Sequence, residues 1–131
     1  MKILITENKL RDTVKSMISE LGTQTTIDFF GGWESFCQRL NINKPMDFLH
    51  LFDNLESIQD EKRPEITLYR YNNGENQIKY DKDSLDVYLS YDNIWSILGD
   101  YFNLNHTKTK ELTQDWIEES YNLRGVITNL W

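Results

Sequence analysis

The chain has 131 residues and a net charge of −7, with 39% apolar and 13% aromatic residues. This length is typical of one domain, and the aromatic content argues against a disordered chain. The single cysteine, Cys37, excludes an intrachain disulfide framework and any multi-cysteine metal site. No stretch approaches the ~20 apolar residues of a membrane span, and the start lacks a signal-peptide core. We therefore expect a soluble cytoplasmic protein with one domain over residues 1–131.

The negative charge is concentrated in the last two-thirds of the chain. Residues 1–45 carry 6 basic and 5 acidic side chains, whereas residues 46–131 carry 8 basic and 16 acidic ones. Because proteins bind nucleic acids and anionic membranes by neutralising phosphates with lysine and arginine, this charge opposes both partners. It permits a basic protein as the partner or simply confers solubility, and no motif indicates a cofactor or a metal.

Apolar residues at helical spacing predict three helices in the first half. The first spans 7–21 with Thr6 as its N-cap, the second spans 33–40, and the third begins at Pro45. Residues 23–30 fit either a strand or a loop that buries aromatic side chains, and residues 60–64 predict a surface loop. The inward side chains are Trp33, Phe36, Cys37 and Leu40 in the second helix, and Phe48, Leu51, Phe52 and Leu55 in the third.

The middle of the chain predicts three strands in an antiparallel β-meander over about 65–91. Asn73-Gly74 is a strong hairpin signal, because both residue types tolerate positive φ. Residues 81–84 are turn formers and predict the second connection.

Helices return after the meander. Apolar residues over 94–102 share one helical face, and Asn105 or Thr107 can cap a last helix that runs to about Asn122 and ends at Arg124-Gly125. The hydrophobic tail 126–131 is expected to dock on the body. The sequence thus predicts an α+β fold in which N-terminal and C-terminal helices pack against the meander.

The stretch GGWESFC at 31–37 poses the choice between an active site and a turn before a buried helix. A glycine pair at a helix start can bind an anion. Here Glu34 would itself occupy the positive end of the helix and would repel an anion such as phosphate. Cys37 shares the apolar face of its helix, where burial makes a thiol unreactive. We therefore predict a turn and a core cysteine.

Asp47, His50 and Asp53 recur at intervals of three residues and would lie close together on a helix. Such a set can serve acid–base or metal-assisted chemistry. It is also what an ordinary polar helix face looks like, and a metal would lack a fourth ligand. The spacing does not determine whether His106 lies near His50.

The predicted last helix carries an acidic face formed by Glu111, Asp115, Glu118 and Glu119. Like charges at i, i+4 cost a few tenths of a kcal/mol. The face is either simply solvated, a docking surface for a basic partner, or a surface that mimics nucleic acid. Tyrosines of the meander could stack on bases, but acidic residues outnumber the basic ones around them, which disfavours nucleic acid. These tyrosines are Tyr69, Tyr71, Tyr80, Tyr88 and Tyr91.

The segments MKILITENKLRD and IWSILGDYFNLN…ELTQDWIEESYNLRGV resemble small uncharacterised proteins of tailed phages and of marine viral and environmental sequences. The resemblance implies a viral origin and a host cytoplasm, and it transfers no catalytic residue. The absence of a chemical motif, the acidic last two-thirds of the chain and the acidic face favour a non-enzymatic protein-binding domain, such as a phage accessory or host-interaction protein. The alternatives are a small metal-assisted hydrolase that uses Asp47, His50 and Asp53, and a homo-oligomeric structural unit joined through the C-terminal tail.

Overall fold

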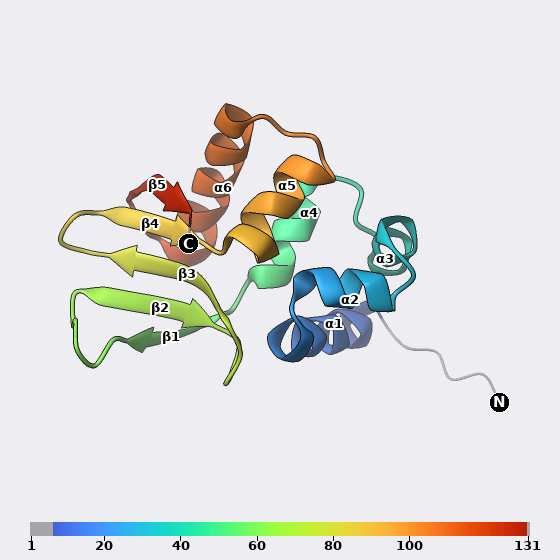
Figure 1. Ribbon diagram of the computed structural model, residues 1–131, viewed down its shortest axis with the longest axis horizontal. Helices are drawn as coiled ribbons and strands as arrows, with labels where there is room; N and C mark the ends of the chain where they lie inside the picture. The colour runs from blue at the N-terminus through green and yellow to red at the C-terminus, as the bar shows by residue number, and fades with distance from the viewer. Residues whose placement is uncertain (1–6, 131) are drawn as a thin grey trace.

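The computed structural model describes residues 7–130, so the expected cap at Thr6 and the last tail residue, Trp131, lie outside the described part. A helical half and a five-stranded sheet lie side by side in an α+β arrangement (Figure 1). The helices are α1 (Glu7–Leu21), α2 (Thr23–Phe29), α3 (Trp33–Leu40), α4 (Pro45–Leu49), α5 (Ser96–Asp100) and α6 (His106–Tyr121). A 3₁₀ turn, His50–Phe52, continues α4, and a π-helical turn, Tyr91–Trp95, precedes α5.

The predicted helices over 7–21 and 33–40 are confirmed as α1 and α3. Residues 23–29 form α2, so the expectation of a strand or loop there is wrong. Thr23, Thr26 and Ile27 fall on one buried helical face, which a pattern rich in threonine concealed. The hydroxyl of Thr26 donates to the carbonyl of Gly22 at 2.7 Å, so this buried hydroxyl has its hydrogen-bond partner within the helical segment.

The helix predicted from Pro45 is shorter than expected. Pro45 occupies its first turn, but the helical segment ends at Phe52. Asp53 is extended and Asn54 has a positive φ of 64°, and together they turn the chain into strand β1, Glu56–Gln59. Pairing of β1 with β2 (Ile66–Arg70) therefore overrides the helical spacing of the apolar residues.

The predicted meander is confirmed as β2, β3 (Asn76–Asp81) and β4 (Asp86–Leu89), which pair antiparallel. It is the centre of a larger sheet in the order β1-β2-β3-β4-β5. The tail forms β5 (Val126–Leu130), which pairs parallel with β4, so the tail docks on its own sheet. Asn122, in the left-handed conformation, ends α6, rather than Arg124-Gly125 as expected.

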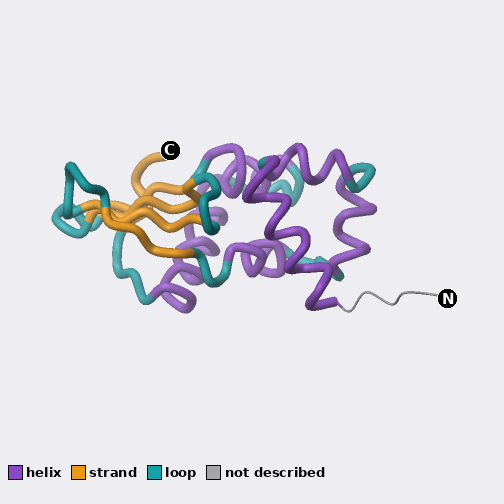
Figure 2. Tube along the Cα trace, turned by 90° about the horizontal axis from the view of Figure 1, so that it is seen from below, coloured by secondary structure: helices purple, strands orange, loops and turns teal. Residues whose placement is uncertain are grey.

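Helix α6 packs on one face of this sheet, and no described helix lies on the opposite face (Figure 2). The covered face buries Ile78, Val87 and Leu89, and the ring of Tyr69 meets that of Tyr121 from α6 at 5.1 Å. The N-cap expected at Asn105 is confirmed, since its side chain accepts the N–H of Lys108. Helix α6 therefore has a fixed start and one side fixed by the sheet.

The β2–β3 hairpin turns as Asn73-Gly74 predicted, with a φ of 56° at Asn73. Gly74 does not have a positive φ and is needed for another reason: a Cβ there would lie 2.1 Å from Ser19 Oγ and 3.1 Å from Ser19 Cα of α1. The second predicted turn is confirmed, because Asp81 Oδ1 accepts the N–H groups of Asp83 and Ser84. The first turn thus packs closely against α1 in the helical half.

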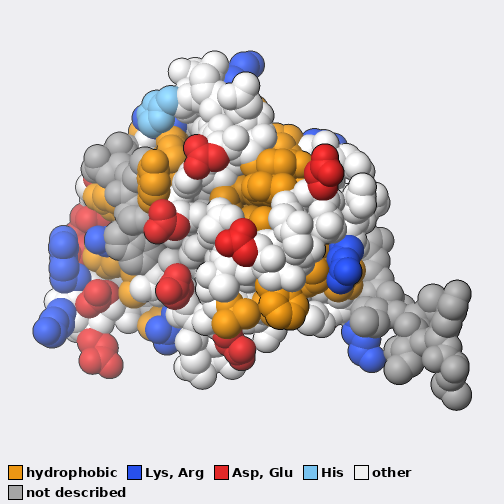
Figure 3. Space-filling model, turned by 45° about the vertical axis from the view of Figure 1, so that its right-hand side comes forward, with side chains coloured by type: hydrophobic (Ala, Val, Ile, Leu, Met, Phe, Trp, Pro, Cys, Tyr) orange, Lys and Arg blue, Asp and Glu red, His pale blue; other side chains and the backbone are white. Residues whose placement is uncertain are grey.

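An aromatic cluster fills the helical half. Trp33 stacks on Tyr101 with 3.9 Å between ring centroids, and it meets Phe36, Phe48 and Phe102 edge-on at 5.5 to 5.9 Å. Apolar side chains reach the surface of this half, with acidic side chains around them (Figure 3). No helix in the described range is long and apolar enough to cross a membrane.

Candidate functional site: the Asp53 network and the acidic face of α6

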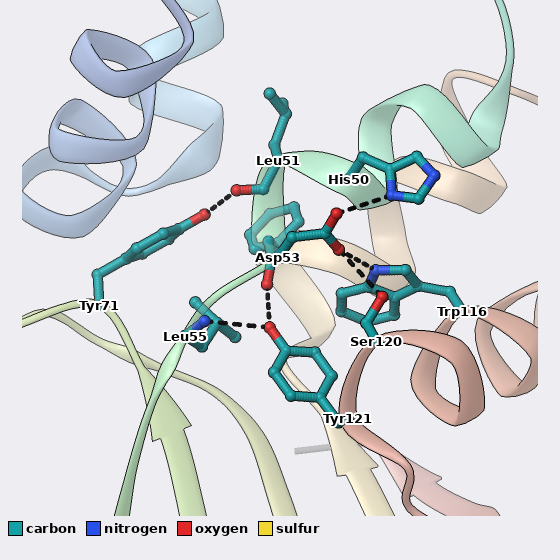
Figure 4. Close-up of polar contacts among 9 residues, drawn as sticks. His50, Leu51, Asp53, Leu55, Tyr71, Trp116, Ser120 and Tyr121 are labelled. Carbon is teal, nitrogen blue, oxygen red and sulfur yellow. Dashed lines mark hydrogen bonds and ion pairs between the residues drawn. The ribbon is translucent and has the colours of Figure 1, made fainter. Parts of the chain in front are cut away.

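Asp53 is the centre of a polar network between α4 and α6 (Figure 4). Its Oδ2 lies 2.8 Å from His50 Nδ1. Its Oδ1 accepts hydrogen bonds from Trp116 Nε1 at 2.8 Å and from Ser120 Oγ at 3.1 Å. The two donors on α6 lie four residues apart, so they face the same way, and one carboxylate connects α6 to the 3₁₀ turn after α4.

Two tyrosines fix the chain on either side of Asp53. The Tyr121 hydroxyl donates to the carbonyl of Phe52 and accepts the N–H of Leu55 at 3.2 Å. The Tyr71 hydroxyl donates to the carbonyl of Leu51. Burial raises the pKa of both phenols above its ordinary value, so both stay protonated as donors. Sequence patterns do not indicate these roles, because the partners lie far apart in the chain.

The structure brings together only two of the three residues spaced over 47–53. His50 and Asp53 form the pair described above, whereas Asp47 Oδ2 accepts the backbone N–H of Asn43 at 3.0 Å, at the start of α4. The ring of His106 packs edge-on against Trp95 at 5.2 Å. Within residues 7–130, no group of three or more His, Cys, Asp or Glu side chains has the arrangement of a metal site.

The hydrogen bonds of the Asp53 network join α6 to the 3₁₀ turn, and their arrangement differs from that of a reaction centre. Both oxygens of Asp53 are occupied, and Ser120 bonds the carboxylate rather than the imidazole, so the three do not form a nucleophile–base–acid relay. Trp116 is completely buried, and its N–H has Asp53 as its acceptor. The network thus fixes the rotation of α6 about its own axis.

This rotation points the four predicted acidic side chains outward, and all four are exposed. Glu111 lies 4.0 Å from the Lys108 ammonium, and Glu118 accepts from Gln114 at 3.3 Å. Asp115 and Glu119 have no hydrogen bond or ion pair within the described part of the chain. A shallow hollow of about 470 Å³ lies beside the face, lined by Met46, Asp115, Glu118 and Glu119.

The glycine pair and the cysteine lie as predicted. Gly31 and Gly32 have φ values of 90° and 102°, which only glycine adopts readily, and they turn the chain into α3. Cys37 is 8% exposed on the inner side of α3. Burial raises the pKa of its thiol, and a hydrogen bond with Tyr101 offsets part of that rise.

We expect Cys37 to react with an aromatic disulfide reagent at least about tenfold more slowly in the native protein than in urea at about pH 8. Since the pKa is raised in the folded state, the thiolate fraction is smaller there at any given pH. The native rate should keep rising at pH values where the rate of the unfolded protein has levelled off. Stopped-flow absorbance at several pH values measures the reaction rates of the native and the unfolded protein. Equal rates would contradict a core cysteine.

No family model, curated protein or solved structure matches the chain.

Proposed function

We propose that this chain is a non-enzymatic binding domain that docks a basic surface of a partner protein on the acidic face of α6, formed by Glu111, Asp115, Glu118 and Glu119. The observation that carries the proposal is the exposure of all four carboxylates on one rigid helix. A role as a phage-type accessory or host-interaction protein is the setting that we propose for this activity.

Repulsion among the like charges of the acidic face lowers the stability of the helix, and a basic partner would remove this loss. Glu111 and Asp115, like Asp115 and Glu119, are spaced i, i+4, and each such pair of like charges destabilises a helix by a few tenths of a kcal/mol. Lysine and arginine side chains of a partner would turn this repulsion into attraction and would speed the encounter. The net charge of −7 adds to the same attraction at longer range.

The hydrogen bonds that join α6 to Asp53 also favour binding at the acidic face. Trp116 and Ser120 hold α6 to Asp53, so the helix that carries the four carboxylates is held in place before any partner arrives. A preordered surface loses less conformational entropy on binding than a flexible one does. Met46 lies among the carboxylates in the adjoining hollow and offers an apolar contact within a charged rim.

The test is a charge reversal with a matched control. The variant Glu111→Lys, Asp115→Lys, Glu118→Lys should keep the fold and lose proteins that the wild-type chain retains from a host-like lysate through a moderate salt wash. The control Asp12→Lys, Glu61→Lys, Asp83→Lys changes the net charge equally at other exposed positions. For the retained protein, we expect affinity at least about tenfold lower with the first variant only.

Circular dichroism shows whether both variants are folded. Equal loss of the partner from both variants would assign the attraction to net charge alone. Full retention of the partner by the first variant would remove this face of α6 from consideration.

A further inference from the structure

A polar hollow of about 440 Å³ lies where the start of α2 meets the hairpin before β3 and the π-helical turn after β4. A smaller hollow of about 300 Å³ shares Glu75 and Ser90 with it, and Gly74 and Asn76 complete its lining. The larger hollow is lined by Gly22, Thr23, Gln24, Thr25, Glu75, Ser90, Asp92, Asn93 and Ser96. No basic side chain lines either one.

Two residues that line these hollows, Thr23 and Asn76, carry buried oxygens without a hydrogen-bond partner. In the described residues, the buried side-chain atoms without a hydrogen-bond partner are Thr23 Oγ1, Asn76 Oδ1, Gln77 Oε1 and Arg70 Nε. Thr23, 1% exposed, lines the larger hollow, and Asn76 lines the smaller one. Gln77, completely buried, follows Asn76, and its Nε2 donates to the carbonyl of Glu75, which fixes the direction of its amide.

The amide oxygens of Asn76 and Gln77 can only accept a hydrogen bond, the hydroxyl of Thr23 can accept or donate one, and none of the three has a partner. A buried polar group left without a partner costs about 1–3 kcal/mol. A ligand that brings several N–H donors to this place can pair with the hydroxyl of Thr23 and with the amide oxygen of Asn76, whereas a ligand rich in acceptors can pair only with the hydroxyl.

The charge at the hollow selects the same kind of ligand. The exposed side chains of Glu75 and Asp92 stand at its surface, and both are carboxylates. Asn93 connects the walls: its Nδ2 lies 3.5 Å from Glu75 Oε2, and its Oδ1 accepts the N–H of Thr23 at 3.3 Å. Thr23, Asn93 and Glu75 thus form one continuous polar wall beneath the negative charge.

The backbone is unusual at the same place. Both Ile94 and Trp95 direct their N–H groups to the carbonyl of Ser90, at 3.1 and 3.2 Å, and the wider turn is π-helical. Such turns are rare and occur often at functional sites. This turn leaves Asp92 exposed while Asn93, the next residue, is 5% exposed.

We propose that this hollow binds a small organic cation with several N–H donors, carried by an ammonium or guanidinium group. Glu75 and Asp92 balance its charge, and the unpaired oxygens of Thr23 and Asn76 accept its N–H groups as the side chains adjust. A metal ion fits less well, because the described residues present no metal-binding group of three such side chains.

The probe is agmatine, which has an ammonium group at one end and a guanidinium group at the other. Isothermal titration of the full chain should give a saturable one-site curve with a Kd below about 1 mM. Tetramethylammonium has the charge but no N–H donor and should give no saturable heat. In amide NMR spectra, the agmatine shifts should fall on residues 22–25, 75–77 and 90–96.

The double variant Glu75→Gln, Asp92→Asn should weaken agmatine at least about tenfold. The matched control Glu61→Gln, Asp83→Asn removes the same charge from exposed positions elsewhere and should bind like wild type. Absence of saturable binding overturns the proposal, as do equal affinities for agmatine and tetramethylammonium. Shifts confined to α6 would also overturn it, and would leave the proposed docking face untouched.

Discussion

Replacement of Asp53 by alanine is expected to lower the free energy of unfolding by about 3 kcal/mol. The carboxylate accepts from Trp116 and Ser120 and pairs with His50, and alanine removes all three partners. The largest part of the loss comes from Trp116, because its N–H would be left without an acceptor in a completely buried residue. Urea denaturation followed by circular dichroism at a fixed pH measures the change.

The conservative variant Asp53→Asn is the control for this prediction. Its remaining oxygen can still accept from Trp116 and Ser120, so we expect it to lose less than half as much stability as alanine does. In a double-mutant cycle, Trp116→Phe and Asp53→Ala should be strongly non-additive, since they break the same hydrogen bond. A loss below about 1 kcal/mol for Asp53→Ala would show that the network does not hold α6.

Gly125→Ala is expected to cost about 3 kcal/mol by overpacking. A Cβ at this position would lie 2.5 Å from the carbonyl oxygen of Leu85 and 2.8 Å from Val87 Cγ2. The Leu85 carbonyl also accepts the N–H of Val126 at 2.9 Å, at the start of β5. The added methyl group would therefore push β5 away from β4 at the point where their pairing begins. Thermal unfolding and amide hydrogen exchange in β5 report the effect.

Gly99→Ala provides the same chemical change without the clash. The nearest atom to a Cβ at Gly99 is the Leu104 carbonyl oxygen at 3.8 Å, an ordinary contact. Gly99 lies inside α5, where alanine is the better helix former by up to about 1 kcal/mol. Gly99→Ala should therefore be neutral or stabilising. Comparable losses from both variants would mean that close packing at Gly125 does not determine the position of β5.

The sequence predicted elements whose apolar spacing and terminal residues agree. Helices α1, α3 and α6 combine a buried face with capping or glycine signals, and the meander has turn residues at both connections. The segment after Pro45 was misassigned because Leu51, Phe52 and Leu55 continue a helical stripe, although Asp53 and Asn54 end it. Strands β1 and β5 are the edges of the sheet and depend on pairing with β2 and β4, which periodicity does not reveal.

The candidate site was predictable to a similar degree. Spacing alone suggested that His50 and Asp53 lie close together, and the helical pattern placed the acidic face outward on α6. The bond from Trp116 to Asp53 spans 63 residues of sequence, and the tyrosine bonds to the backbone of 51–55 are also long-range. The polar hollow unites residues near 23, 75 and 92, so only the folded chain brings its acceptors together.

The central claim is that a basic protein docks on the acidic face of α6. Zero-length carbodiimide cross-linking of the wild-type chain to its retained partner, read out by mass spectrometry, tests this claim most directly because it joins carboxylates to lysines in contact. We expect the cross-links to join partner lysines to Glu111, Asp115, Glu118 or Glu119. Cross-links concentrated instead on acidic residues of the sheet, such as Glu56 or Asp86, would contradict the claim.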